Sequence, residues 1–296
     1  MGTLKGIDIS SWQKSNEMNW SKLAKEIDFA IIRTGYGNST SQIDSQFEAH
    51  MSNAIKSGVK RIGVYHFNYC RSIAEAKIEA QVAMQICSKF KKYISFIAFD
   101  WEYDSCSYCQ KSGMTPTRAL VDSMAAAFKA EVEKNGYKFV LYTNPDYGSR
   151  YFTLSKYDNL WIAQYASSCS IQNADIWQYT STGRLSGYNG NLDVNICYNT
   201  KLFNHTNTEE KIMGYAVKSL LRIAMNLKII SKVTLASDAV IGTGTQKSLK
   251  EVQKILGLKQ TGEVDEKTVQ GLTKLVEDKL KSMKGVTALQ QTIAGV

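Results

Sequence analysis

No apolar run in this sequence approaches 18 residues, which excludes a membrane-spanning helix. The first six residues lack the apolar stretch of a secretory signal, so we expect a protein that starts in a cytoplasm. Histidine occurs only three times, and Cys106 and Cys109 are the only close pair among six cysteines. Because a zinc site needs a second such pair or nearby histidines, we predict no metal and no cofactor. We expect free, mostly buried thiols, with a Cys106–Cys109 disulfide as the alternative.

Negative charge is also in short supply. The 296 residues carry 36 Lys and Arg against 27 Asp and Glu, a formal net charge of +9. Residues 201–296 hold 15 of these cations and 9 of the acids, so most of the excess lies there. Nucleic acid, an anionic membrane surface and an acidic cell-wall polymer all fit that charge. Because no helix-turn-helix or aromatic-basic motif and no membrane segment accompanies it, we predict neither nucleic acid nor membrane as a partner.

Short apolar runs alternate with amphipathic stretches over the first 200 residues. Near-continuous apolar runs are typical of strands buried on both faces, as in a parallel sheet. Helical spacing marks residues 43–57, 74–90 and 117–135, whereas the stretches after residue 140 are short for helices. Eight such strands predict an α/β fold, an irregular (β/α)8-like barrel with parallel strands. The eight runs are 6–9, 29–33, 62–67, 96–100, 139–142, 160–163, 176–179 and 192–194.

The pattern changes after residue 200. Residues 201–210 are polar and lose the strand pattern, so we expect a linker there. Helical patterns follow at 211–230, near 246–256 and from about 265. We therefore predict a barrel in residues 1–200 and a small, mainly helical domain in residues 211–296.

Acidic residues stand at the ends of several predicted strands. In a parallel barrel these ends converge on one face, so Asp8, Asp100, Glu102 and Asp193 are expected to lie together. Asp100 and Glu102 are two positions apart, so both side chains point the same way, with Cα atoms roughly 6.6 Å apart. Their mutual repulsion should keep a proton on one of them near neutral pH. Glycoside hydrolysis uses such a pair, although an Asp-x-Glu tripeptide is also common at solvated strand ends.

Several segments resemble the motifs of glycoside hydrolase family 25 lysozymes, over about residues 4–198. Residues 6–13 (GIDISSWQ), 29–33 (FAIIR) and 63–67 (GVYHF) are similar to the family's opening signature. Residues 99–102 (FDWE) are similar to its catalytic Asp-x-Glu strand, and the Cys-Ser-Tyr-Cys insertion that follows departs from the family and is expected to reshape one wall of the groove. The later strand ends match at YTN (142–144), LWIAQY (160–165), IWQY (176–179) and DVN (193–195).

The resemblance implies an N-acetylmuramidase that cuts the β-1,4 bond between N-acetylmuramic acid and N-acetylglucosamine of bacterial peptidoglycan. By matching position, Glu102 is the general acid. Asp100 is either the nucleophile or the group that steers the substrate's N-acetyl carbonyl in substrate-assisted cleavage. Asp8 and Asp193 complete the acidic set by orienting substrate and holding the charges of the pair. The close spacing of Asp100 and Glu102 favours retention of configuration.

Aromatic side chains crowd the same strand ends, and sugars present apolar faces that lie on aromatic rings. Tyr65 and Tyr142 are the preferred sugar-binding candidates, because polar residues follow them closely. Trp161 and Trp177 fit the barrel core equally well. The full aromatic set is Tyr36, Tyr65, Trp101, Tyr142, Trp161, Trp177 and Tyr179.

Three polar residues are candidate anchors for acetamido or carboxylate groups of the substrate. They are Arg33, Asn144 and Gln164. His66 also lies at a strand end, but a histidine there is more often a hydrogen-bonded core residue than a catalyst.

The last third of the chain carries a second resemblance. Residues 252–256 (VQKIL), 262–265 (GEVD) and 267–268 (KT) resemble helical peptidoglycan-binding domains. A basic wall-binding module fits the charge, because wall polymers carry phosphates and carboxylates. The alternative is a helical domain for packing or for homo-oligomer formation.

A barrel of this kind joined to such a module indicates a phage endolysin, present in the host bacterial cytoplasm before lysis and at the cell wall afterwards. Two other interpretations stay open. One is a non-catalytic wall-binding protein on a decayed barrel. The other is a chitinase-like hydrolase, although such families carry Asp-x-x-Asp-x-Asp-x-Glu, and residues 98–102 lack the earlier acids.

Overall fold

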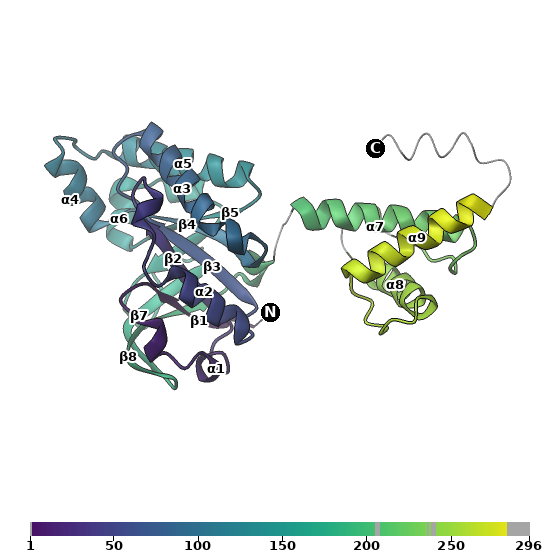
Figure 1. The fold of residues 1–296 in the computed structure, drawn as a ribbon. Helices are drawn as coiled ribbons and strands as arrows, with labels where there is room; N and C mark the ends of the chain where they lie inside the picture. The colour runs from purple at the N-terminus through teal and green to yellow at the C-terminus, as the bar shows by residue number, and fades with distance from the viewer. Residues whose placement is uncertain (1, 205–207, 236, 238–240, 283–296) are drawn as a thin grey trace. The chain divides into compact units, whose positions relative to one another are not determined.

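The computed structural model describes residues 2–204, 208–235, 237 and 241–282. The chain divides into two compact units, residues 1–206 and 207–296. All strands labelled in Figure 1 belong to the first unit, and helices α7, α8 and α9 form the second. Within the described ranges no helix combines the length and the apolar character that a membrane crossing needs.

Eight strands close into one barrel in the order β1 to β8, as predicted. Neighbours from β1 to β7 pair in parallel, but β8 is antiparallel to both β7 and β1, so the all-parallel expectation is wrong. Only residues 186–187 separate β7 from β8, and a parallel crossover needs a dozen or more residues. The strands are β1 Leu4–Ile9, β2 Phe29–Tyr36, β3 Arg61–Phe67, β4 Ile94–Asp100, β5 Lys138–Thr143, β6 Leu160–Ala163, β7 Ile176–Leu185 and β8 Tyr188–Cys197.

Helices cover the outside of the barrel, mostly after the first strands (Figure 1). The two longest of them begin at side-chain caps, because Ser72 accepts from the Glu75 N–H and Thr117 accepts from the Leu120 N–H. After β5 the connections shorten, as expected: α6 has seven residues, and residues 164–175 contain no helix. The helices are α1 Trp20–Leu23, α2 Phe47–Lys56, α3 Ile73–Cys87, α4 Tyr103–Lys111, α5 Arg118–Lys134 and α6 Pro145–Tyr151, and the short 3-10 helices are η1 Ser15–Glu17, η2 Thr40–Gln42, η3 Ser88–Tyr93, η4 Leu154–Lys156 and η5 Thr200–Phe203.

Aromatic rings fill the barrel at the amino ends of its strands. Phe203 of η5 packs against Phe29 and Phe96, with ring centroids 4.8 and 5.4 Å apart. Gly6 and Gly63 make room for those rings, since a Cβ there would stand 2.4 and 2.2 Å from atoms of Phe29 and Phe96 respectively. The interior of the barrel is therefore a packed core at this end.

The linker expected at residues 201–210 is wrong in its first part. Leu202 and Phe203 are buried in the barrel core. The Lys138 ammonium donates to the carbonyls of Lys201, Leu202 and Asn204, which fixes the chain there. These two apolar residues complete the core, and residues 205–207 of the expected linker lie outside the described residues.

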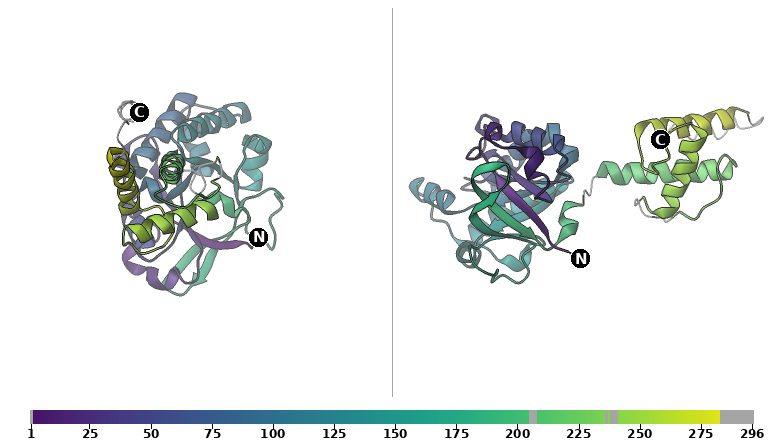
Figure 2. Two further views of the ribbon diagram at one scale, coloured as in Figure 1. Left: turned by 90° about the vertical axis from the view of Figure 1, so that its right-hand side faces the viewer. Right: turned by 90° about the horizontal axis from the view of Figure 1, so that it is seen from below.

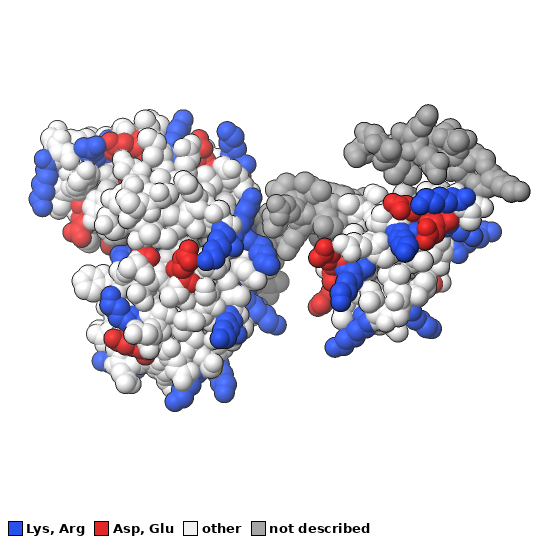
Figure 3. Space-filling model, viewed as in Figure 1, with Lys and Arg blue, Asp and Glu red and all other residues white. Residues whose placement is uncertain are grey.

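In its described residues the second unit has three helices around a small core, close to the predicted ranges. They are α7 Thr208–Asn226, α8 Thr243–Ile255 and α9 Glu266–Ser282. Leu221, Leu249 and Leu272 are fully buried in this core. The green and yellow ribbons of Figure 2 are these three helices. On the face drawn in Figure 3, Lys and Arg side chains project from both units.

Candidate active site

A cavity of about 590 Å³ opens at the carboxyl ends of the barrel strands. All four predicted acids line it, together with Asp104 from the first turn of α4. Asp8 lies near the end of β1 and pairs in register with Asp193 of β8. Asp100 is the last residue of β4, and Glu102 stands two residues later at the start of α4. The barrel therefore brings together the acids that the strand pattern predicted to converge.

Asp8 is held by a network of amide groups from β7 and β8. Its Oδ2 accepts from Gln178 Nε2 at 2.8 Å and from Asn195 Nδ2 at 2.7 Å. Burial and, after it, the charge of Asp193 together raise the pKa of Asp8 to about 8, although the two amide donors oppose the shift. At neutral pH Asp8 therefore retains a proton for much of the time.

Aromatic side chains fix those two amides. The Trp161 indole N–H donates to Asn195 Oδ1 at 2.8 Å. The Tyr142 hydroxyl donates to Gln178 Oε1 at 3.3 Å. Since the amide oxygens are engaged, the amide nitrogens must point at Asp8.

Asp100 has a different environment from Asp8. It is 3% exposed, and within the described residues its Oδ1 is buried without a hydrogen-bond partner. Burial raises its pKa well above the ordinary value, and the charges of Glu102 and Asp8 add to the shift. Its backbone is clamped by Asn68, whose Oδ1 accepts from the Asp100 N–H and whose N–H donates to the Asp100 carbonyl. The backbone of Asp100 is therefore fixed, and its side chain has an acceptor atom that no described residue uses.

Glu102 is partly buried at the wall of the same cavity. Burial raises its pKa to about 7, and the charges of Asp104 and Asp193 contribute. The Ser105 hydroxyl accepts from the Glu102 N–H at 3.1 Å, which fixes the backbone at this strand-to-helix turn. Glu102 can thus hold a proton in slightly acidic solution and release it to a bound group.

Arg33 is the one cation among the described residues that line the cavity. Its Nε lies 2.7 Å from Oδ2 of Asp44, and its Nη2 donates to the Ser11 hydroxyl at 2.8 Å. Asp44 was not predicted, although it is the group that positions the guanidinium. Arg33 is therefore placed to attract a carboxylate or an amide carbonyl, as expected for an anchor.

Of the four aromatic residues predicted to bind sugar, Tyr65, Tyr142 and Trp161 line the cavity and Trp177 does not. Both tyrosines contact the Trp161 ring at centroid distances of 5.8 and 4.5 Å. Trp161 is only 1% exposed, so it is mainly a core residue beneath the cavity. Trp12, which we had not selected, lines the cavity with 82% of its side chain exposed and offers an open face to a ligand.

Three predicted binding residues do not line the cavity. Asn144 accepts from the Tyr147 N–H as the N-cap of α6. The side-chain oxygen of Gln164 accepts from the Ser170 N–H. The third residue, Trp177, is 7% exposed, and its indole N–H donates to the backbone carbonyl of Gln164. An Asn before Pro145 is a typical helix start, and that signal in the sequence favoured a cap over a ligand.

Sequence reasoning missed Gln178, Asn195 and Asn68 as supporting residues. Each is a buried amide in or directly after an apolar strand. A polar side chain in such a place needs a hydrogen-bond partner, so the strand pattern did carry a signal. The partner itself was not readable, because it comes from another strand.

His66 is a core histidine, as expected. Its Nδ1 lies 2.8 Å from the Thr34 hydroxyl and its Nε2 lies 2.8 Å from the Gly37 carbonyl. Burial lowers its pKa to about 4, so it stays neutral. Cys106 and Cys109 are both buried on α4 with free thiols. Over the described ranges, no group of three or more His, Cys, Asp or Glu residues could hold a metal ion.

The sequence also resembles families and proteins that are already known. A family model described as "Glycosyl hydrolases family 25" matches residues 7–188, and one described as "Putative peptidoglycan binding domain" matches residues 217–272. The chain is 27% identical to "Lysozyme M1" of Streptomyces globisporus over 206 residues, which cover 65% of this chain and 67% of that protein.

Two solved structures share the fold of the barrel. A glycosyl hydrolase 25 of Streptococcus pneumoniae, described as a virulence factor, aligns with a TM-score of 0.57 and 23% identity, covering 69% of this chain and 92% of that one. The catalytic domain of endolysin ply40 from bacteriophage P40 of Listeria monocytogenes aligns with a TM-score of 0.53 and 23% identity, covering 70% and 98%.

Proposed function

The chain belongs to glycosyl hydrolases family 25, and on that premise we propose that it cleaves the β-1,4 bond between N-acetylmuramic acid and N-acetylglucosamine with Glu102 as general acid. Membership makes it a glycoside hydrolase, a lysozyme that hydrolyses peptidoglycan. The observation that carries the residue assignment is the gathering of Asp8, Asp100, Glu102 and Asp193 around one cavity at the mouth of a closed barrel.

Glu102 suits the role of the acid because of its proton affinity. With a pKa of about 7, roughly nine in ten molecules carry the proton at pH 6. In the first step that proton moves to the bridging oxygen as the bond from this oxygen to C1 of N-acetylmuramic acid breaks. General acid catalysis of this kind contributes about 100- to 10,000-fold to the rate.

Asp100 suits the role of an assistant to the substrate's acetamido group. Its Oδ1 is a buried acceptor without a partner among the described residues, so it can receive the acetamido N–H. That donor would lower the raised pKa of Asp100 and favour the carboxylate. The acetamido carbonyl oxygen then bonds to C1 as the leaving oxygen departs, and Asp100 balances the positive charge on the resulting ring.

Water completes the reaction at the opposite face of the intermediate. It attacks C1, the bond from the acetamido oxygen to C1 breaks, and the Glu102 carboxylate takes the proton of the water. The product keeps the configuration of the substrate. Direct attack of Asp100 on C1 is the alternative, and it also predicts retention, through a covalent glycosyl-enzyme.

The remaining cavity residues bind and orient substrate in this proposal. Arg33 attracts a carboxylate or amide carbonyl, and Tyr65, Tyr142 and Trp12 offer aromatic surface to the sugars. Asp8 helps to orient substrate, whereas the charges of Asp104 and Asp193 help to keep the proton on Glu102, because negative charge nearby raises its pKa.

The second unit serves, in this proposal, to hold the enzyme on the wall. Residues 217–272 match the peptidoglycan-binding model, and residues 201–296 carry 15 cations against 9 acids. Tethering raises the local concentration of substrate at the cavity. Sedimentation of the protein with insoluble walls tests this: binding should persist in Glu102→Gln and weaken with salt. Formation of a homo-oligomer through this unit stays a prediction, for which light scattering is the measurement.

We also place the enzyme among phage endolysins, released from the host cytoplasm to the wall at lysis. The support is the pairing of a family 25 barrel with a wall-binding module and the likeness to the Listeria phage endolysin. Lysis of cells that produce the protein, only after the membrane is permeabilised, is the expected result. Lysis without permeabilisation would contradict this role.

Glu102→Gln tests the catalytic assignment. We expect loss of about a thousand-fold in turnover on purified walls, with unchanged folding, because the amide has no proton to give. The matched control is Glu133→Gln on α5, a helix-surface acid paired with Lys129, which should keep full activity. Near-normal release of reducing ends by Glu102→Gln would remove Glu102 from the role. No release by the unaltered protein would favour a binding protein on a decayed barrel.

A further inference from the structure

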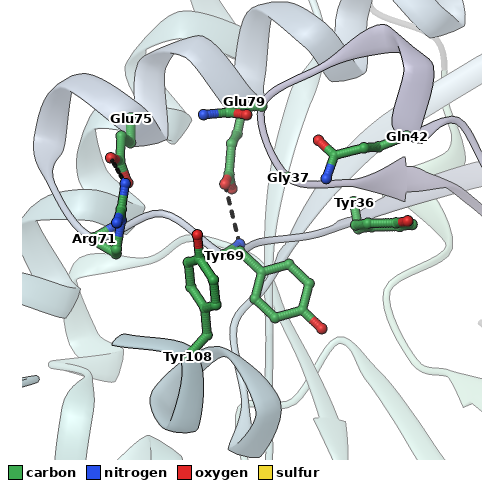
Figure 4. Close-up of a pocket in the computed structure, with 9 residues that line it drawn as sticks. Tyr36, Gly37, Gln42, Tyr69, Arg71, Glu75, Glu79 and Tyr108 are labelled. Carbon is green, nitrogen blue, oxygen red and sulfur yellow. Dashed lines mark hydrogen bonds and ion pairs between the residues drawn. The ribbon is translucent and has the colours of Figure 1, made fainter. Parts of the chain in front are cut away.

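A second, smaller pocket of about 290 Å³ lies beside the active-site cavity. Tyr36 and Tyr69 line both, so the two spaces share a wall. Figure 4 shows Glu75 and Glu79 reaching down from α3, with Tyr108 of α4 beneath them and Tyr36 on the far side. The volume of the pocket lies at the lower limit of the roughly 300–1,000 Å³ of sites for drug-sized ligands, so the end of a side chain fits it better than a sugar chain does.

Three tyrosine rings, of Tyr36, Tyr69 and Tyr108, form its aromatic lining. Tyr69 stands edge-on to Tyr36 and Tyr108, with centroids 6.1 and 5.2 Å apart. The Arg71 guanidinium lies 5.5 Å from the centre of the Tyr108 ring and holds it in place. Tyr36 and Tyr108 are both about 42% exposed, so their rings are open to a ligand.

Glu79 supplies the charge of this lining. It is 2% exposed, and its carboxylate accepts from Asn68 Nδ2 at 2.7 Å and from the Tyr69 N–H at 3.2 Å. A carboxylate has about four acceptor sites, and a backbone hydrogen bond from Cys70 takes a third, so one remains for a ligand. Arg71 and Glu75 cancel each other through a two-point ion pair at 3.1 and 2.6 Å. The net charge of the lining is therefore that of Glu79.

A buried carboxylate beside open aromatic rings is the combination that stabilises a cation. Burial raises the pKa of Glu79 to about 7, and a bound cation would lower it again. Peptidoglycan offers such a group next to its glycan chain, because the peptide stem on N-acetylmuramic acid contains a diamino acid. Its primary ammonium group is at the end of a flexible side chain, which suits a small pocket beside the glycan site.

We propose that the pocket formed by Tyr36, Tyr69, Tyr108 and Glu79 binds the side-chain ammonium group of the peptide stem while the glycan occupies the neighbouring cavity. This inference rests on the proposed muramidase function and adds stem recognition to it. The enzyme then prefers glycan that carries stems with a free amino group. Tyr108 lies on α4, in the Cys-Ser-Tyr-Cys segment of residues 106–109, and lines this pocket.

Three forms of one peptidoglycan test the proposal: with free stem amino groups, with those groups acetylated by acetic anhydride, and with the stems removed. The measurement is kcat/KM from release of reducing ends by the full-length protein. For the unaltered protein, acetylation should lower kcat/KM about five- to thirty-fold, which corresponds to a desolvated cation on aromatic rings. Equal values on the free and acetylated forms would overturn the proposal.

Variants of the pocket sharpen the result. Tyr108→Ala should lose most of the ratio between the free and acetylated forms, and Tyr108→Phe should keep it, since the ring rather than the hydroxyl attracts the cation. Tyr103→Ala is the control on the same helix: Tyr103 packs on Tyr147 and lines neither space, so its ratio should equal that of the unaltered protein. A Tyr108→Ala variant that loses equally on all three forms would show a sugar subsite instead and contradict ammonium binding.

Glu79→Gln tests the charge of Glu79 in the pocket separately from its hydrogen bond with Asn68. Because Glu79 also holds Asn68, which clamps Asp100, we expect a common loss on all three forms in addition to loss of the ratio. A common loss with the ratio intact would overturn the assignment of Glu79 to the pocket. The stem-free form isolates the underlying function: if the unaltered protein releases no reducing ends from any form, the proposed muramidase fails, whatever the pocket binds.

Discussion

At the amino ends of the strands the barrel is filled by Phe29, Phe96 and Phe203, whereas at the carboxyl ends it holds Asp8, Asp100 and the neighbouring acids. The first group is apolar and packed ring against ring. In the second group, burial raises the pKa values of Asp8, Asp100, Glu102 and Asp193. Burying apolar rings stabilises the fold, and burying carboxyls costs free energy. The packed aromatic end thus stabilises the fold and offsets the free-energy cost of the carboxyls buried at the other end.

The comparison predicts which substitutions change stability and which change turnover. All five tryptophans lie in residues 1–206, so tryptophan fluorescence follows unfolding of the barrel without a signal from the helical unit. Stability and kcat can therefore be measured for the same region.

Phe203→Ala has the largest expected effect on stability. Removing a ring that fills the end of the barrel leaves a cavity and should lower the free energy of unfolding by about 3–5 kcal/mol. Phe203→Leu, which keeps part of the volume, should lose less. Urea unfolding followed by tryptophan fluorescence measures both. A loss of kcat in Phe203→Ala without loss of stability would contradict the division between the two ends.

Asp193→Asn, at the carboxyl ends of the strands, should raise the free energy of unfolding and not lower it. Burial raises the pKa of Asp193 to about 6, so the folded barrel binds its proton more tightly than the unfolded chain does. The free energy of unfolding therefore falls as pH rises from about 4 to 6, and the penalty is complete above 6. Allowing for partial exposure, the variant should gain about 1–2 kcal/mol at pH 7.5.

The control for this gain is the same pair of proteins at low pH. Near pH 4 Asp193 is protonated in the folded state, so Asp193→Asn should match the unaltered protein in urea unfolding. A gain of equal size at both pH values would mean that packing, and not charge, explains it.

Asp104→Asn has the smallest expected effect and concerns the proton on Glu102. Burial is the main cause of the raised pKa of Glu102, and the charge of exposed Asp104 is the next. Without that charge Glu102 loses its proton at lower pH. The alkaline limb of the pH profile of kcat/KM should therefore shift to lower pH by about half a pH unit or less.

The matched variant is Asp158→Asn, which neutralises an acid that is 81% exposed in its side chain and is paired with Lys129. The alkaline limb should stay where it is in that variant. High salt should also reduce the shift seen with Asp104→Asn, since salt screens exposed charges. An upward shift would contradict the assignment of the limb to Glu102.

Much of the barrel was predictable, because each strand core is a short apolar run whose neighbours in sequence are neighbours in the sheet. The direction of β8 was not. Thr180 to Arg184 are polar and partly exposed, so the apolar pattern indicated only 176–179 and hid the long hairpin that makes β8 antiparallel. Leu202 and Phe203 were missed for a related reason: two apolar residues among polar ones carry no periodicity, and only the closed barrel provides their partners.

The acids of the site were predictable for a simple reason, since strand ends of a barrel converge. The groups that tune them were not, because Gln178, Asn195 and Asn68 act across strands that are far apart in the chain. Asn144 and Gln164 do not line the cavity, and local backbone groups already use their side chains. A polar residue at a strand end therefore has two possible uses, and hydrogen bonds decide between them.

The identity of the sugar at the new chain end tests the central claim most directly. One peptidoglycan of defined composition is digested with the full-length protein, reduced with borohydride and analysed by mass spectrometry. The account predicts that the reduced ends are N-acetylmuramitol. Reduced ends made of N-acetylglucosaminitol, or fragments with no new reducing end, would contradict it.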